Sequence, residues 1–256
     1  MRYTSPPNSN VPALVRLWDP SSQKRTRARN HDRAILNDMS DSARSVLVIG
    51  ATGLVGKEIV RQLLADSTVS SVTALTRRPI EGARDGKLRN AVVDFDKLSD
   101  YARAFSVDQL FCALGTTIKQ AGSQDAFRHI DHDIPLSAAT LGAREGVKDF
   151  LLVSALGASA ASRVFYNRVK GELEDALRTM GFRSLTIARP SLLVGERDNP
   201  RLVEQIGARL GWLVPGKYKP VRATLVAAAL VDAARRAEPG MHIIESDDIQ
   251  RVPVSN

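Results

Sequence analysis

Short apolar runs alternate along most of this sequence with longer stretches whose apolar residues recur at helical spacing. The run at 46–49 has the length of a buried strand, and the stretch at 54–64 repeats its apolar positions like an amphipathic helix. The same pattern predicts further strands at 72–76, 91–95, 109–113, 150–154, 184–188 and 242–245. It predicts further helices at 124–145, 164–180, 201–213 and 224–236. This alternation is typical of the α/β class: a doubly wound parallel sheet with helices on both faces.

Residues 1–38 lack a sustained apolar period and are rich in Pro, Ser, Asn and Arg, so we expect a disordered basic leader there. Arg-rich, acid-poor leaders can be organelle transit peptides, but Asp19, Asp32 and the Pro6-Pro7 pair weaken that interpretation. Alternatively, translation begins at Met39, just ahead of the first strand. We expect residues 39–256 to form one domain, with a small substrate-binding part at about 190–256.

A glycine-rich segment, Gly50-Ala51-Thr52-Gly53-Leu54-Val55-Gly56, links the first predicted strand to its helix. In Rossmann folds, glycines at this spacing allow a tight turn, close approach of the backbone to a pyrophosphate, and close helix–strand packing. The N–H groups that open the helix would then face the phosphates. The order strand, loop, helix is the context that this motif requires. The predicted phosphate contacts are Gly50, Thr52, Gly53, Leu54, Val55 and Gly56.

The end of the second predicted strand indicates which nucleotide fits. NAD sites place an acidic residue there to hold the ribose 2′-hydroxyl. This sequence has Arg77 and Arg78 instead, and guanidinium groups suit a 2′-phosphate. We therefore expect NADP(H), with a solvated strand end as the alternative. Asp94 closes the third predicted strand, where it would contact the adenine edge or cap the following loop.

Tyr166 and Lys170 are separated by one helical turn and share a face of the predicted helix. A neighbouring ammonium favours phenolate and would lower the tyrosine pKa. Tyr166 is therefore a candidate general acid for carbonyl reduction, or a base in the reverse direction. The alternative is an exposed pair without a catalytic role.

These motifs together resemble the short-chain dehydrogenase/reductase superfamily over about 210 residues, from Ser45 onward. The segments 111–117, 153–158 and 169–172 are similar to its atypical branch, which includes the Tat-interacting-protein oxidoreductase and bacterial relatives. The resemblance implies an NADP(H) site, with Lys170 also holding the nicotinamide ribose. Besides the glycine loop, that site would include Arg77, Arg78, Asp94, Phe95, Ala113, Leu114, Gly115, Tyr166, Lys170, Arg189 and Pro190.

The sequence departs from the superfamily at the hydroxyl residue that usually follows the fifth strand and binds the substrate oxygen. Alignment with extended members puts Ala155 at that position, with Ser154 one residue earlier. We take Ser154 as the third catalytic residue, beside Tyr166 and Lys170. If its hydroxyl points elsewhere, the triad is incomplete.

The remaining features narrow the class of protein. The net charge of +8 comes without a groove-reading motif, so nucleic acid is not the expected partner. No apolar run is long enough to span a bilayer, and the single cysteine, Cys112, favours a cytoplasmic location. His129 and His132 with their flanking aspartates fit a solvated helix face better than a metal site, so we expect no metal.

Two functions fit this sequence. The first is an NADP(H)-dependent oxidoreductase that acts on a small carbonyl or hydroxyl compound. The second is a non-catalytic NADP(H)-binding regulator that senses redox state and binds a protein partner, since fold alone does not fix function. A homodimer is compatible with either.

Overall fold

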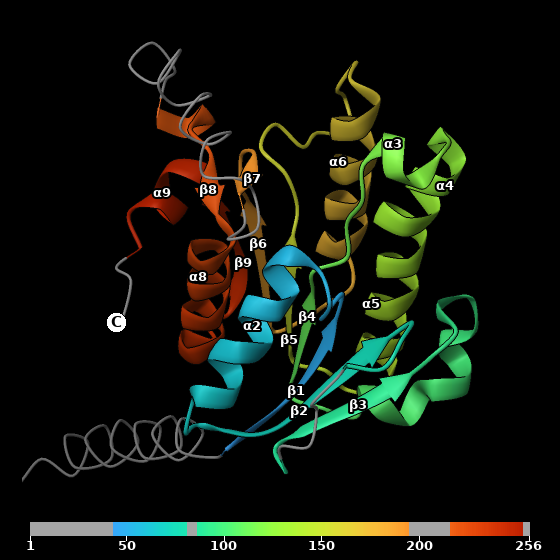
Figure 1. Cartoon of the computed structure of the whole chain (residues 1–256), viewed down its shortest axis with the longest axis vertical. Coiled ribbons are helices and arrows are strands. Elements are labelled where there is room, and N and C mark those ends of the chain that lie inside the picture. Colours follow the sequence, from blue (N-terminus) through green and yellow to red (C-terminus); the bar gives the residue numbers. More distant parts are fainter. Residues whose placement is uncertain (1–42, 81–85, 195–215, 253–256) are drawn as a thin grey trace, which may run out of the picture. The chain divides into compact units, whose positions relative to one another are not determined.

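The computed structural model describes residues 43–80, 86–194 and 216–252 of the chain. Its centre is a sheet of seven parallel strands in the order β3-β2-β1-β4-β5-β6-β9 (Figure 1). The strands are β1 (Arg44–Ile49), β2 (Val69–Thr76), β3 (Leu88–Val92), β4 (Gln109–Cys112), β5 (Asp149–Val153), β6 (Ser184–Arg189) and β9 (Gly240–Glu245). This architecture confirms the predicted doubly wound Rossmann-type fold.

The strand order reverses at β1, which pairs with β2 on one side and β4 on the other. Val46 lies opposite both Val72 of β2 and Gln109 of β4, so the three strands start at nearly the same level. Because all seven strands are parallel, their carboxyl ends lie along one edge of the sheet. Ligands of doubly wound sheets bind at that edge, outside the point where the strand order reverses.

Helices cover both faces of the sheet (Figure 1). One face packs against α2 (Leu54–Ala65) and α8 (Ala223–Arg236), which also contact each other. The other face packs against α5 (Ile134–Arg144), α6 (Phe165–Arg178) and the 3₁₀ segment η1 (Phe95–Phe105). Within β1, Val46 and Val48 enter the first core, while Leu47 and Ile49 enter the second. This alternation of buried side chains explains why the strand reads as a continuous apolar run.

Besides differences of up to three residues at the ends of other elements, two predicted elements differ in position or continuity. The third strand was expected at 91–95 but spans Leu88–Val92, because Asp94 caps η1 and the chain turns there. The long helix expected at 124–145 is divided into α4 (Gln124–Arg128), a π-helical turn η2 (His129–Asp133) and α5. A π turn adds one residue to the helical repeat, which periodicity alone does not reveal.

Smaller elements complete the carboxyl edge and the C-terminal part. They are α3 (Ile118–Ala121), β7 (Leu193–Val194), η3 (Gly216–Tyr218), β8 (Val221–Arg222) and α9 (Ser246–Gln250). Among the described residues, no helix combines the length and apolarity that crossing a membrane requires. The predicted leader at 1–38 and the predicted helix at 201–213 lie outside the described residues.

Candidate functional site

The glycine loop folds tightly around the carbonyl group of Gly50 at the end of β1. Gly50 adopts φ +81°, and a Cβ there would lie 2.5 Å from the backbone of Ala113, at the end of β4. A Cβ on Gly56 would overlap the Gly50 carbonyl, and one on Gly53 would lie 3.2 Å from it. Gly50 and Gly56 are therefore required by backbone packing, which brings α2 close to the sheet, and Gly53 is tightly packed.

The first turn of α2 is open. Gly53 is its N-cap, and within the described chain this turn has neither a capping side chain nor an acidic residue. Thr52, Gly53 and Leu54 are exposed, whereas Val55 and Gly56 are buried beneath them. Unpaired N–H groups at a helix start, with its partial positive charge, form an anion site. The loop therefore has the shape and polarity that a pyrophosphate requires.

The two arginines that follow β2 are exposed. Neither makes a hydrogen bond or an ion pair within the described part of the chain. Asp94 stands at the corresponding end of β3, and its carboxylate accepts a hydrogen bond from the Asp96 N–H at 3.1 Å. The same carboxylate lies 3.8 Å from the Lys97 ammonium. Asp94 thus caps η1, which was one of the two roles expected for it, and Phe95 begins that helix.

Tyr166 and Lys170 lie on α6, where the structure adds a partner that the sequence did not reveal. Lys170 Nζ lies 2.6 Å from Asp131 Oδ1, and the two side chains are 3% and 0% exposed. The other Asp131 oxygen accepts a hydrogen bond from the Thr116 N–H at 2.9 Å. Tyr166 packs its ring 5.3 Å from that of Phe127, which is fully buried on α4. These contacts fix both α6 side chains at the carboxyl edge.

The electrostatics of this group differ from the sequence-based expectation. Burial raises the pKa of Tyr166, and this outweighs the lowering effect of Lys170. The Asp131 carboxylate acts in the same direction as burial, because a negative charge disfavours phenolate. The expectation of a lowered tyrosine pKa is therefore wrong. For Lys170, burial opposes the charged form, but Asp131 together with Tyr166 and Cys112 outweighs burial, and the lysine pKa is raised.

Ser154 is held in a different network. Its hydroxyl donates a 2.5 Å hydrogen bond to Glu174, which is 1% exposed on α6. Arg189 donates to the same carboxylate and also to Glu245 at the end of β9. Hydrogen bonding to Glu174 raises the pKa of Arg189. In this geometry Ser154 and Arg189 fix α6 to the ends of β5, β6 and β9, and the hydroxyl of Ser154 is engaged by Glu174.

The segment after β4 lies between the glycine loop and α6. The backbone of Ala113 and Leu114 faces Gly50, while a Cβ at Gly115 would lie 3.6 Å from Asp131 Oδ1. Pro190, after β6, accepts a hydrogen bond from the Leu156 N–H. Cys112 ends β4 and is completely buried, and this burial raises its thiol pKa to about 11. The predicted residues from β1, β4 and α6 are thus brought to one edge of the sheet.

The two histidines of η2 have carboxylate partners. His129 Nε2 lies 2.7 Å from Asp96, and His132 Nδ1 lies 2.7 Å from Asp133. Within the described ranges, no cluster of three or more metal-ligating side chains has the geometry to hold a metal ion.

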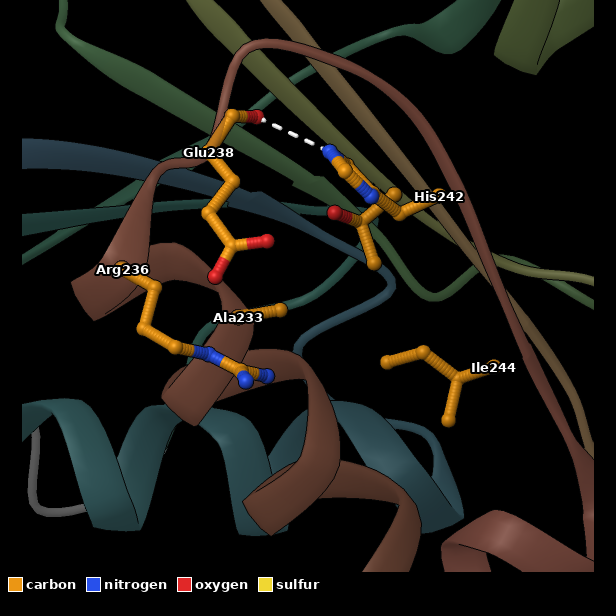
Figure 2. Close-up of a pocket in the computed structure, with 6 residues that line it drawn as sticks. Ala233, Arg236, Glu238, His242 and Ile244 are labelled. Atoms are coloured by element: carbon orange, nitrogen blue, oxygen red, sulfur yellow. Dashed lines mark hydrogen bonds between the residues drawn. The ribbon is translucent and has the colours of Figure 1, made fainter.

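A small hollow lies away from this edge, between α8, β6 and β9 (Figure 2). Its volume is about 210 Å³, below the range of about 300 Å³ and more that is typical of ligand pockets. Its lining residues are Thr186, Ala233, Arg236, Glu238, His242 and Ile244. His242 contacts the Glu238 carbonyl at 3.1 Å, as the dashed line in Figure 2 shows. None of the predicted site residues lines this hollow.

Sequence reasoning missed Asp131, Glu174 and Phe127. Asp131 was noticed only as a neighbour of the two histidines. Its contact with Lys170 depends on how η2 packs against α6, which no local spacing encodes. Glu174 lies one turn beyond Lys170 on the same helix, so the i, i+4 spacing could have drawn attention to it.

The fold and the glycine loop define a dinucleotide-binding protein of the Rossmann type. A family model described as NAD(P)H-binding matches residues 50–237, and the chain belongs to that family. It is 34% identical over 224 residues to "Protein FMP52, mitochondrial" of Candida albicans, a match that covers 81% of this chain and 97% of the relative. It is 32% identical over 219 residues to "Protein HTATIP2" of Rattus norvegicus, covering 83% and 90%.

Solved structures support the fold assignment. MoeE5 in complex with UDP-glucose and NAD matches with a TM-score of 0.62 and 17% identity, covering 80% of this chain and 79% of that one. UDP-glucose 4-epimerase from Thermotoga maritima matches with a TM-score of 0.60 and 18% identity, covering 78% and 76%. At these identities the likeness shows the shared fold alone.

The predicted cytoplasmic location is wrong by the same comparisons. Fungal relatives from Candida albicans, Emericella nidulans and Aspergillus terreus are named mitochondrial. The physical basis of the prediction was weak, because a single buried thiol fits any reducing compartment equally well.

Proposed function

We propose that the carboxyl edge of the sheet binds NADP(H), with the pyrophosphate on the open first turn of α2. The support is local: a helix start at Thr52–Leu54 that is exposed and has no capping side chain, and two glycines, Gly50 and Gly56, whose packing leaves no room for a Cβ. A phosphate would satisfy donors that are otherwise left to water. Leu114 and Gly115, in the segment that follows β4 and faces the glycine loop, would complete the floor of the same site.

The preference for NADP(H) over NAD(H) rests on the two arginines after β2. Both side chains are exposed and free of partners in the described structure, and no acidic residue takes the place of the usual ribose ligand. A guanidinium group can bind a phosphate through two parallel hydrogen bonds, whereas it offers little to a neutral ribose hydroxyl.

The test of this preference is a pair of titrations. NADPH should bind the wild type at least about tenfold more tightly than NADH, since hydrogen bonds to charged groups contribute about 1.5–3 kcal/mol. Arg77→Asp should remove most of that difference by weakening NADPH. Arg89→Asp, an exposed substitution within β3, is the matched control and should leave the ratio unchanged. Equal affinities in the wild type would contradict the assignment.

We propose further that the protein is an oxidoreductase of the short-chain dehydrogenase type that acts on a small carbonyl or hydroxyl compound. The observation that carries this is the placement of Tyr166 one turn from a buried, charged Lys170 at the carboxyl edge. The cofactor supplies the hydride chemistry. Tyr166 would move a proton at the substrate oxygen, and Lys170 would hold the nicotinamide ribose and favour the tyrosinate form.

Tyr166→Phe tests the catalytic assignment. General acid–base catalysis accelerates reactions by roughly 100- to 10,000-fold. Turnover on an accepted carbonyl substrate should therefore decrease by a factor in that range. NADPH binding should change less than about twofold, because the hydroxyl alone is removed. Tyr101→Phe, on η1, is the matched control and should retain full turnover. Full activity in Tyr166→Phe would refute the role.

One observation favours a second function, a non-catalytic NADP(H)-binding regulator. The Ser154 hydroxyl is engaged by Glu174, and Ala155, at the aligned position, has none. A site without that hydroxyl loses a donor for the substrate oxyanion. Tight NADPH binding with no turnover across a broad carbonyl panel would favour this second function, and turnover that depends on Tyr166 would exclude it.

A further inference from the structure

The positively charged ammonium of Lys170 is buried and poorly solvated. Its side chain is 3% exposed, and the titratable groups that act on it come from three elements: Asp131 of η2, Tyr166 of α6 and Cys112 of β4. Burial raises the pKa values of Tyr166 and Cys112, so both are neutral near neutral pH. Of these groups, Asp131 alone supplies a compensating negative charge. An ammonium buried without such a partner gives up its proton readily.

The π turn of η2 places Asp131 in that position. Asp131 and His132 are buried, while His129 and Asp133 on the same turn are about half exposed. One Asp131 oxygen is fixed by the Thr116 N–H from the segment after β4. The other lies 2.6 Å from Lys170 Nζ. The carboxylate is thus tied to the segment after β4 by one oxygen and paired with Lys170 by the other.

Stability alone explains this pair poorly. Buried ion pairs recover little more than the desolvation cost of their charges, and apolar residues of similar volume often serve as well or better. The position of this buried pair beside Tyr166, at the carboxyl edge, indicates a role at the site.

We propose that Asp131 is a positioning residue that keeps Lys170 charged and fixed at the nicotinamide end of the cofactor site. This inference rests on the proposed function as an NADP(H) site. It assigns to Asp131 the control of the pH range over which Lys170 can bind a ribose hydroxyl and favour tyrosinate. Without the Asp131 carboxylate, the Lys170 side chain would be a neutral amine over part of the pH range in which the wild-type side chain is charged.

The charge of Lys170 can be measured without any cofactor. Lysine side chains labelled with ¹³C at Cε report their protonation by NMR, and Lys170→Met identifies the Lys170 resonance. In the wild type, Lys170 should titrate above the ordinary lysine pKa of about 10.4. In Asp131→Asn it should titrate at least about one unit below that value. Asp133→Asn, on the same turn but exposed, is the matched control and should behave as the wild type.

The second readout is the pH dependence of NADPH binding between about pH 7 and about pH 9.5, a range in which Lys170 should lose its charge in Asp131→Asn but keep it in the wild type. Wild-type affinity should vary less than about twofold, while Asp131→Asn should bind about tenfold more weakly at the upper end. The double variant Asp131→Asn, Lys170→Met should bind weakly at every pH, without that dependence. An equal loss at all pH values in Asp131→Asn would overturn the proposal.

The two readouts separate this inference from the proposed function. If the wild type does not bind NADPH, the proposed function fails, while the NMR titration still decides whether Asp131 keeps Lys170 charged. If Asp131→Asn does not fold, the wild-type titration decides alone. A Lys170 that titrates with the exposed lysines, or below them, would overturn the role of Asp131.

Discussion

The two edges of the sheet differ in how completely the fold satisfies their charged groups. At the amino edge, two buried carboxylates are matched by arginines: Asp66 pairs with Arg44 and Arg235, and Asp149 pairs with Arg183. At the carboxyl edge, α6 is likewise held by buried ion pairs, but the part that follows β1 and β2 is different. There, Arg77 and Arg78 lack partners among the described residues, and the first turn of α2 has no capping side chain. The comparison separates the polar groups that the fold satisfies from those that remain for solvent or, under the proposed function, for an anion.

The largest expected effect comes from closing the space in the glycine loop. Gly50→Ala combines a positive φ with a Cβ 2.5 Å from Ala113, so we expect a loss of about 3 kcal/mol in the free energy of unfolding. Gly181→Ala has a similar φ of +75° but nothing within 4 Å, and should lose about 1 kcal/mol. Urea unfolding of both variants measures the difference. Equal losses would show that crowding at the carboxyl edge costs nothing.

The next effect tests the matched amino edge. Burial alone would raise the pKa of Asp66, but hydrogen bonds from Thr68 and Arg235 outweigh it and lower that pKa to about 2. The stabilisation from Asp66 is therefore complete above the unfolded-state pKa of about 4, and it is lost as the pH falls towards about 2.

Asp66→Asn should accordingly lower the free energy of unfolding at neutral pH by about 2 kcal/mol. It should also flatten the dependence of stability on pH between about pH 4 and about pH 2. NADPH binding should be unaffected, because the substitution lies at the opposite edge. Unfolding curves at a series of pH values test this prediction. If the stability of the variant depended on pH as steeply as that of the wild type, Asp66 would not be the cause of the dependence.

A third prediction concerns the network that anchors α6. Glu174 accepts hydrogen bonds from Ser154 and Arg189 while almost fully buried, so Glu174→Gln should cost about 1.5 kcal/mol. The matched control is Glu172→Gln on the same helix, whose ion pair with Arg128 is partly exposed and should contribute less than about 1 kcal/mol. Chemical denaturation compares the two. A larger loss in the control would mean that the buried network is not what holds α6.

The smallest effect separates the two roles expected for Asp94. Asp94→Ala should cost about 1 kcal/mol of stability through loss of the cap on η1, while Asp94→Asn should retain the cap. If the carboxylate also contacts adenine, Asp94→Asn should weaken NADPH binding several-fold at unchanged stability. Thermal unfolding and NADPH titration of both variants provide the measurement. Unchanged NADPH affinity would leave Asp94 as a cap alone.

The fold was predictable because each buried strand appears as a short apolar run and each helix as a periodic one. The glycine loop and the Tyr166–Lys170 pair were predictable for the same reason, since their spacing is local. Asp131 and Glu174 were not identified, because their roles depend on contacts across 39 and 20 residues of sequence. The third strand was predicted three residues too far along the chain. The tendency of Asp94 to cap a helix was not weighed against the strand propensity of its neighbours.

The reactivity of Cys112 can report local opening of the core around β4. It is the one cysteine in the sequence, it is wholly inaccessible at the end of β4, and its pKa of about 11 keeps it in the unreactive thiol form. A thiol reagent can therefore modify the protein only in states in which the core around β4 has opened. The rate of alkylation, measured by mass spectrometry, then reports how often this opening occurs. A ligand that bridges the glycine loop and α6 should stabilise the closed state and slow the alkylation.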